Sequence, residues 1–72
     1  MNKNLLLGMI KTKGETCKEV ADLIGVSRVS FSKKLNEKDG ASFTQPEIKK
    51  MKNHFGLNPE QTDSIFFADW VS

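Results

Sequence analysis

The residues from 27 to 36 combine cations, hydrogen-bond donors and small side chains in a pattern suited to contact with a large charged partner. At the spacing of an α-helix, one side of this segment is apolar and the opposite side is basic and small. The side chains predicted to face outward are Ser27, Arg28, Val29, Ser32, Lys33 and Asn36. A short helix with such an outward side fits the major groove of DNA, where side chains reach the edges of the bases.

Arg28 and Val29 offer the most specific contacts in this set. An arginine near the start of a helix can donate two hydrogen bonds to a guanine or bind a phosphate, and a solvated surface arginine is the plainer alternative. Val29 can contact a thymine methyl group or a protein, or it can pack sideways on a neighbouring helix. Ser30, Lys34 and Lys38 are further candidates for phosphate contacts. Four or five cations on phosphates predict a logarithmic salt dependence of binding with a slope of about −4.

Two short helices joined by a glycine turn are predicted to position this outward side. Thr16 and Glu19 form a T-x-x-E capping box, which starts the first helix. Gly25 can adopt the left-handed conformation that ends a helix sharply, and Ser27 can cap the helix that follows. The predicted helices span 17–24 and 28–36, and the whole helix-turn-helix pattern spans 16–36.

Three more helices complete an all-α fold of five short helices. The first spans about 3–13, the fourth lies between the capping residue Thr44 and Gly56, and the fifth begins after Asn58. A polar loop is expected at 37–42. Apolar stripes are predicted at Leu5, Leu6, Met9 and Ile10, at Val20, Leu23 and Ile24, and at Ile48, Met51 and Phe55. With 72 residues, the chain is expected to form one domain over 1–72.

Composition argues against most enzymatic and membrane functions. Cys17 and His54 are the only cysteine and the only histidine, too few for the four ligands of a usual zinc site, and no metal or other cofactor is expected. No catalytic constellation is recognised, and no apolar run approaches the roughly 20 residues of a membrane span. The single cysteine agrees with a cytoplasmic location. Residues 1–53 hold all 11 Lys/Arg and 6 of the 9 acids, whereas 54–72 hold 3 acids and no Lys/Arg.

The last segment, the C-terminal helix and aromatic tail at 58–72, suggests a second surface. At helical spacing, Phe67, Trp70 and Val71 fall on a different side from Ile65 and Phe66. Because exposed aromatic clusters mark interfaces, Phe67, Trp70 and Val71 are candidates for a protein interface. The alternative is that the tail folds back and completes the core.

Taken together, the motif GVSRVSFSKKLN, the segment TQPEI and the five-helix pattern resemble the Cro/repressor-type helix-turn-helix family of temperate phages. Within it, residues 2–67 are similar to a group of small Cro-like proteins from phages of Gram-positive bacteria. The resemblance implies a lambda-repressor/Cro-like fold and a regulator of the lysis–lysogeny switch in the host bacterial cytoplasm. It implies either binding to the cognate phage repressor, which modulates repression, or stand-alone binding to operator DNA as a homodimer.

Cys17 departs from the pattern of that family. The family commonly places a glutamine at the start of the first motif helix, where it contacts a phosphate, and a thiol is a poor donor for such a contact. Together with the net charge of only +2 and the outward Val29, this departure favours a protein partner. The basic outward side of the second motif helix favours DNA, and both modes can operate together.

Overall fold

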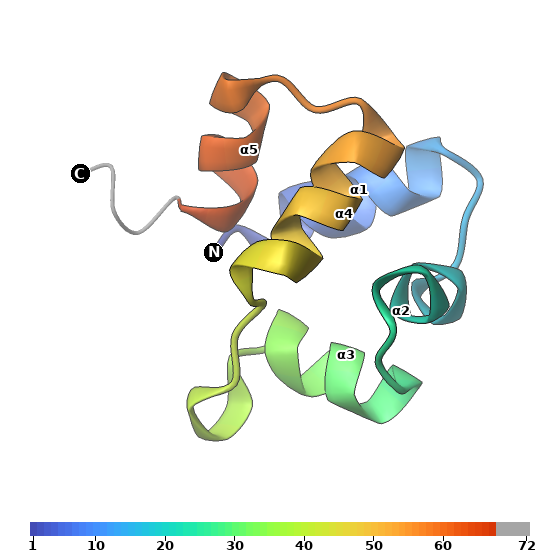
Figure 1. Ribbon diagram of the computed structural model, residues 1–72, viewed down its shortest axis with the longest axis vertical. Coiled ribbons are helices and arrows are strands. Elements are labelled where there is room, and N and C mark those ends of the chain that lie inside the picture. Colours follow the sequence, from blue (N-terminus) through green and yellow to red (C-terminus); the bar gives the residue numbers. More distant parts are fainter. Residues whose placement is uncertain (68–72) are drawn as a thin grey trace.

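The computed structural model describes residues 1–67, which fold into five α-helices joined by short turns (Figure 1). The elements are α1 Lys3–Thr12, α2 Cys17–Ile24, α3 Arg28–Leu35, the 3-10 turn η1 Lys38–Gly40, α4 Gln45–Phe55 and α5 Pro59–Phe66. Within the described residues there is no strand, so the predicted all-α class is confirmed. The predicted helix boundaries agree with these elements to within about one residue.

Local capping explains where the helices begin. At the start of α2, the Thr16 Oγ1 accepts a hydrogen bond from the Glu19 N–H at 3.2 Å, and Glu19 Oε1 accepts one from the Thr16 N–H at 2.9 Å. The same reciprocal pairs start α4 and α5, at Thr44–Glu47 and Asn58–Gln61. Because each box satisfies two backbone donors that a helix leaves unpaired, these residues define the starts independently of the rest of the fold.

The connection between α2 and α3 is a tight turn at Gly25. Its backbone is left-handed, with φ 81° and ψ 28°, a conformation that glycine adopts without the steric cost of a Cβ. The Gly25 N–H donates to the Asp22 carbonyl and the Val26 N–H donates to the Ala21 carbonyl, at 3.2 and 3.0 Å. These bonds satisfy the last carbonyls of α2 and turn the chain into α3.

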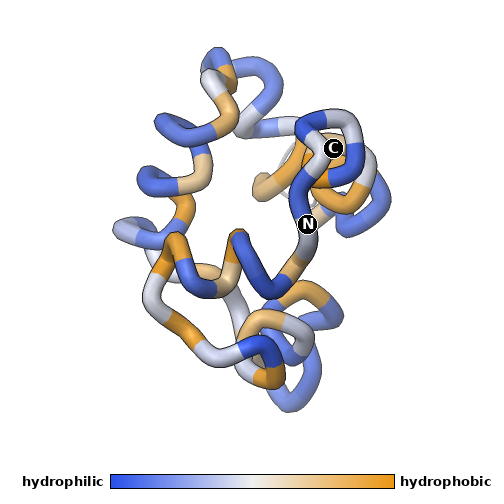
Figure 2. The backbone as a smooth tube through the Cα atoms, turned by 90° about the vertical axis from the view of Figure 1, so that its right-hand side faces the viewer, coloured by the Kyte–Doolittle hydropathy of each residue, from blue (hydrophilic) through white to orange (hydrophobic). Residues whose placement is uncertain are grey.

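The helices enclose a core to which each of them contributes. In Figure 1, α4 runs through the middle of the molecule in front of α1, with α3 below it and α5 above and to the left. α2 packs against α3 and α4, and α1 packs against α5. The most completely buried large side chains are Leu6, Val20, Phe31 and Met51, one from each of the first four helices. In Figure 2, apolar and hydrophilic stretches alternate along the chain, as expected of helices that bury only one side.

A chain of aromatic rings links α3 to α5. Phe31 and Phe43 meet edge to face with their ring centroids 5.4 Å apart, and Phe43 meets Phe66 in the same way at 6.1 Å. Phe43 lies in the connection that follows η1, so this connection contributes to the core. The inner side of α3 is thereby held against the remainder of the molecule, which leaves the opposite side outward.

Two leucines predicted for the apolar stripes lie at the surface instead. Leu23 is 38% exposed and Leu5 is 47% exposed. The buried side of α2 is formed by Val20, Ala21 and Ile24. At 100° per residue, Leu23 lies about 60° from Val20 but about 160° from Ala21, so it falls at the edge of that side. The prediction of Leu23 as a core residue is therefore wrong, and the small Ala21 takes the place.

The predicted polar loop at 37–42 contains a feature that the sequence did not indicate. Glu37 and Asp39 both adopt left-handed backbone conformations, with φ 52° and 55°, on either side of Lys38. Glu37 precedes the turn η1 and Asp39 lies within it, and all four residues from 37 to 40 are exposed.

None of the helices in residues 1–67 is both long enough and apolar enough to cross a membrane, and the longest has 11 residues.

Candidate functional site

The predicted outward residues of α3 do share one exposed side of the helix. We call Arg28, Val29, Ser32 and Lys33 the α3 outer face, because all four are exposed, whereas Phe31 and Leu35 of the same helix are buried. Val29 is 66% exposed, the most exposed of the large apolar side chains identified at the surface. A shallow hollow of about 520 Å³ runs along this face, lined by Val29, Ser32, Lys33, Asn36 and Lys38. The fold thus places Lys38 of η1 beside α3.

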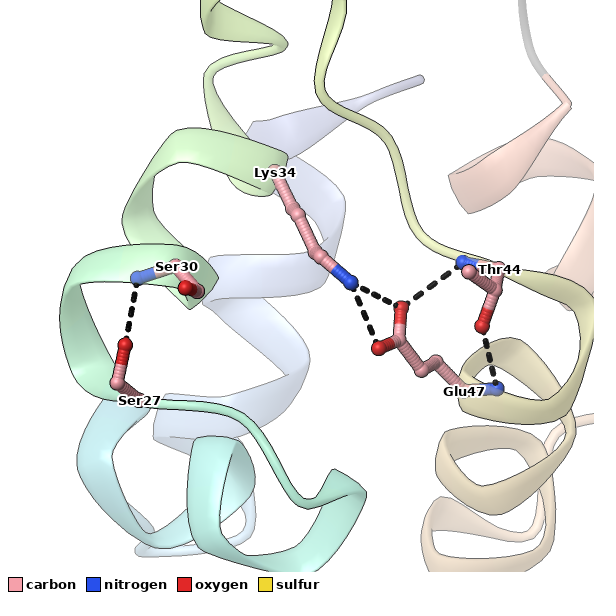
Figure 3. A network of polar contacts seen from close by, with 5 residues as sticks. All are labelled: Ser27, Ser30, Lys34, Thr44 and Glu47. Atoms are coloured by element: carbon pink, nitrogen blue, oxygen red, sulfur yellow. Dashed lines mark hydrogen bonds and ion pairs between the residues drawn. The ribbon is translucent and has the colours of Figure 1, made fainter.

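Ser27 and Asn36, predicted to face outward with this set, lie at the two ends of α3. The Ser27 Oγ accepts a hydrogen bond from the Ser30 N–H at 3.1 Å, so Ser27 caps the helix (Figure 3). The Asn36 Nδ2 donates to the Ser32 carbonyl, and its Oδ1 accepts from Lys3 Nζ, both at 2.9 Å. These polar groups therefore define the length of α3 and tie its end to α1. Ser30, a predicted phosphate contact, is half-buried.

Lys34, also predicted as a phosphate contact, binds a carboxylate of the same chain. Its Nζ donates to both oxygens of Glu47 on α4, at 2.7 and 2.6 Å (Figure 3). The side chains of Lys34 and Glu47 are only 19% and 13% exposed. Lys34 lies 100° around α3 from Lys33, on the side toward α4, and this rotation brings it to Glu47. In this arrangement the Lys34 ammonium is occupied by a carboxylate of the same chain, and its contact with a phosphate stays a prediction.

The Glu47 carboxylate accepts hydrogen bonds from two places at once, the start of its own helix and the Lys34 side chain of α3. Besides Lys34, its Oε1 accepts the Thr44 N–H at 2.9 Å and so closes the capping box of α4. Burial raises the pKa of Glu47, but the hydrogen bonds and charge of Lys34 and the hydrogen bonds of Thr44 outweigh it and hold the pKa below its usual value. The carboxyl is therefore ionised at neutral pH and neutralises Lys34.

Three cations remain available around the α3 outer face. Within residues 1–67, no carboxylate forms an ion pair with Arg28, Lys33 or Lys38. Glu37 and Asp39 flank Lys38 and are exposed. Glu37 accepts a hydrogen bond from the N-terminal ammonium at 2.7 Å, so Asp39 is the acid that reduces the positive potential at that end of the face. The result is a modestly basic surface with an apolar side chain, Val29, near its middle.

Cys17 begins α2, at the position where the resemblance implies a phosphate-binding glutamine. The side chain is half-buried and packs against the core. A thiol in such surroundings behaves as a small apolar group and adds no strong donor to the neighbouring surface.

The C-terminal surface predicted from the aromatic tail is only partly described. Phe67 directly follows α5 as its C-cap, where its N–H donates to the Asp63 carbonyl at 3.0 Å, and its half-buried side chain packs against the core. Phe67 also lines two hollows of about 740 and 380 Å³, which share Gln45 and Ile48 as lining residues. Trp70 and Val71 lie outside the described residues. Phe67 thus belongs in part to the core, and the two interpretations of the remaining tail concern residues outside the described range.

Within residues 1–67, no three His, Cys, Asp or Glu side chains gather as a metal site would require. His54 instead meets Glu15, with its Nε2 2.8 Å from both carboxylate oxygens. No family model, curated protein or solved structure matches this chain. Function is therefore inferred from the residues of the α3 outer face and from their surroundings.

Proposed function

We propose that this chain is a helix-turn-helix regulator with a lambda-repressor/Cro-like fold, in which α2 and α3 form the motif. Three features support this class: the capped start of α2, the left-handed Gly25 between the helices, and the short basic outer face of α3. The same motif carries the resemblance of the sequence to the Cro/repressor-type family. A regulator of this class needs no cofactor and acts in the cytoplasm of the host bacterium.

Within this class, we propose a role in the lysis–lysogeny switch of a temperate phage. The chain acts as a modulator of repression by binding the cognate phage repressor and changing how that repressor binds DNA. The observation that carries this proposal is Val29, an apolar side chain that is 66% exposed on the face where a groove-reading helix presents polar groups. Burying an exposed valine side chain against a partner contributes about 1.5–3 kcal/mol, so Val29 is suited to be an apolar anchor in a protein interface.

Charge supports the same choice of partner. DNA affinity comes largely from cations that neutralise phosphates. Here Lys34 is already paired with Glu47, Cys17 replaces a phosphate-binding amide, and the net charge is only +2. The surface that remains is better suited to a protein with an acidic or polar rim than to a long polyanion.

The test is a pull-down of the purified cognate repressor by wild type and by Val29→Asp. We expect Val29→Asp to weaken repressor binding about thirtyfold or more, the effect of losing an anchor of about 2 kcal/mol. Leu23→Asp is the matched control, because Leu23 is a partly exposed leucine on α2 rather than on the α3 outer face. Circular dichroism should show that both variants stay folded. Unchanged binding by Val29→Asp would remove this face from the repressor interface.

The second candidate function is that of a stand-alone Cro-like repressor that binds operator DNA as a homodimer. The exposed and unpaired Arg28 and Lys33 favour it. A gel shift with DNA of the phage switch region, with each protein alone and with both together, separates the two candidates. If the chain alone binds this DNA tightly at physiological salt, and Arg28→Ala and Lys33→Ala abolish regulation while Val29→Asp does not, the stand-alone repressor is the correct function.

A further inference from the structure

The capping box of α4 contains more charge than a capping box needs. A box requires only an oxygen that accepts the N-cap N–H, and in α5 the neutral Gln61 supplies it, with Oε1 3.0 Å from the Asn58 nitrogen. In α4 a carboxylate, Glu47, does the same for Thr44 at 2.9 Å. The α2 box also contains a carboxylate, Glu19, and an acid in the first turn suits the helix dipole. What distinguishes the charge of Glu47 is its second partner, the Lys34 ammonium.

That charge is directed at α3. Lys34 Nζ lies 2.7 and 2.6 Å from the two Glu47 oxygens, and no other ion pair within the described residues involves a Lys or Arg side chain of α3 (Figure 3). Lys34 is adjacent in sequence to Lys33, which lies on the α3 outer face. A lysine ammonium on its flexible four-carbon stem can turn toward the rim of that face once its counter-ion is removed.

We propose that Glu47 is an internal counter-ion that withdraws Lys34 from the phosphate-binding cations of α3 and so shifts the α3 outer face from DNA toward a protein partner. The choice between the two partners is then determined in part by a residue of α4 that touches neither of them. The preference for a protein rests on the function proposed above, whereas the withdrawal of Lys34 is independent of it.

The arithmetic of counter-ion release gives a direct measure of this withdrawal. Each lysine or arginine on a phosphate changes the slope of log K against log salt by about −0.9. With Arg28, Lys33 and Lys38 alone, the slope is expected to be about −2.7, and release of Lys34 should make it about −3.6. The probe is a short random-sequence duplex DNA, because phosphate contacts do not depend on the base sequence.

The experiment compares three substitutions in this salt titration. Glu47→Gln keeps an oxygen for the Thr44 N–H, as Gln61 does in α5, but removes the charge, and it should steepen the slope by about 0.9. Lys34→Gln should leave the slope as in wild type, because that lysine is already neutralised. Lys33→Gln is the matched control from the same helix and should make the slope shallower by about 0.9. The double variant Lys34→Gln/Glu47→Gln should return to the wild-type slope.

Two results would overturn the proposal. One is a slope that Lys34→Gln reduces as much as Lys33→Gln does, since Lys34 would then bind phosphate in spite of Glu47. The other is a Glu47→Gln variant, folded by circular dichroism, whose binding to the duplex is as weak and as salt-dependent as that of wild type. If the slopes follow the expectation but the pull-down detects no repressor binding, the counter-ion role of Glu47 stands and the modulator function fails.

Discussion

The two sides of α3 contain the same kind of residue in different circumstances. Lys33 is exposed on the outer face, whereas Lys34, the next residue, has its ammonium between the two oxygens of Glu47. A rotation of 100° around one helix separates a cation that is available to a partner from one that the fold has already neutralised. The net charge counted along α3 therefore exceeds the positive charge that the helix offers to a binding partner, because Lys34 is already paired within the chain.

This difference also bears on the choice of partner. On the outer face, Arg28 and Lys33 accompany the apolar Val29, and Lys38 of η1 lies beside them. We call the side of α3 that contains Lys34 and faces α4 the inner flank. There the ion pair of Lys34 and Glu47 connects α3 to the start of α4 and is mostly buried. The inner flank thus helps to hold α3 in place, and the outer face remains for recognition. The predictions that follow disturb first the turn that sets both sides, then the ion pair, then the protonation of its carboxylate.

The largest effect is expected at the turn that fixes which side of α3 faces outward. Gly25 has φ 81°, and a Cβ there would meet no atom within 4 Å, so the cost of Gly25→Ala is backbone strain alone, about 1–2 kcal/mol. Gly8 is the matched control. It lies within α1 with equally open space around it, and Gly8→Ala should stabilise the protein by about 0.5–1 kcal/mol.

Thermal unfolding measures both changes. For a domain of this size, 1 kcal/mol corresponds to a shift in Tm of roughly 4–8 °C, so the two variants should move Tm in opposite directions. If Gly25→Ala leaves Tm unchanged, the left-handed turn is absent and the assignment of residues to the two sides of α3 is wrong.

The features predicted correctly from the sequence are those that depend on neighbours along the chain. Thr16 with Glu19, and Asn58 with Gln61, form hydrogen bonds across three residues, so residue types and spacing were enough to place the helix starts. The outward position of Arg28 and Val29 followed in the same way from the helical period.

The features that were missed depend on how the helices cross. Lys34 and Glu47 are 13 residues apart, and their bond requires a particular approach of α3 to α4 that no local pattern encodes. The exposure of Leu23 likewise depends on how α2 packs, because the buried side of this helix includes Ala21 and leaves Leu23 at its edge. For Lys34 the sequence did not reveal the partner, and for Leu23 it did not reveal the side of the helix that is buried.

An intermediate effect is expected when the ion pair of the inner flank is removed. A double-mutant cycle with Lys34→Met, Glu47→Gln and the double variant isolates the coupling between the two side chains. Because both are mostly buried, we expect a coupling of about 1 kcal/mol in urea unfolding, at the upper end of the range for exposed pairs. A coupling near zero would mean that the contact does not hold α3 against α4. Lys33 and Lys34 would then differ only in how exposed they are.

The smallest effect is the dependence of this coupling on pH. The pKa of Glu47 is lower in the folded protein than in the unfolded chain, where it is close to 4.5. A carboxyl with a lowered folded pKa contributes stability that is complete above its unfolded pKa and is lost as the pH falls through its folded pKa. The Tm difference between wild type and Glu47→Gln should therefore be constant at neutral pH and shrink below about pH 4.5. Lys34→Met is the companion variant: burial of Glu47 is then no longer opposed by the ammonium, the pKa of Glu47 rises, and the Tm difference from wild type shrinks over the same acid range. A difference that stays constant from neutral pH into this range would show that the two substitutions act through packing rather than through the charge of Glu47.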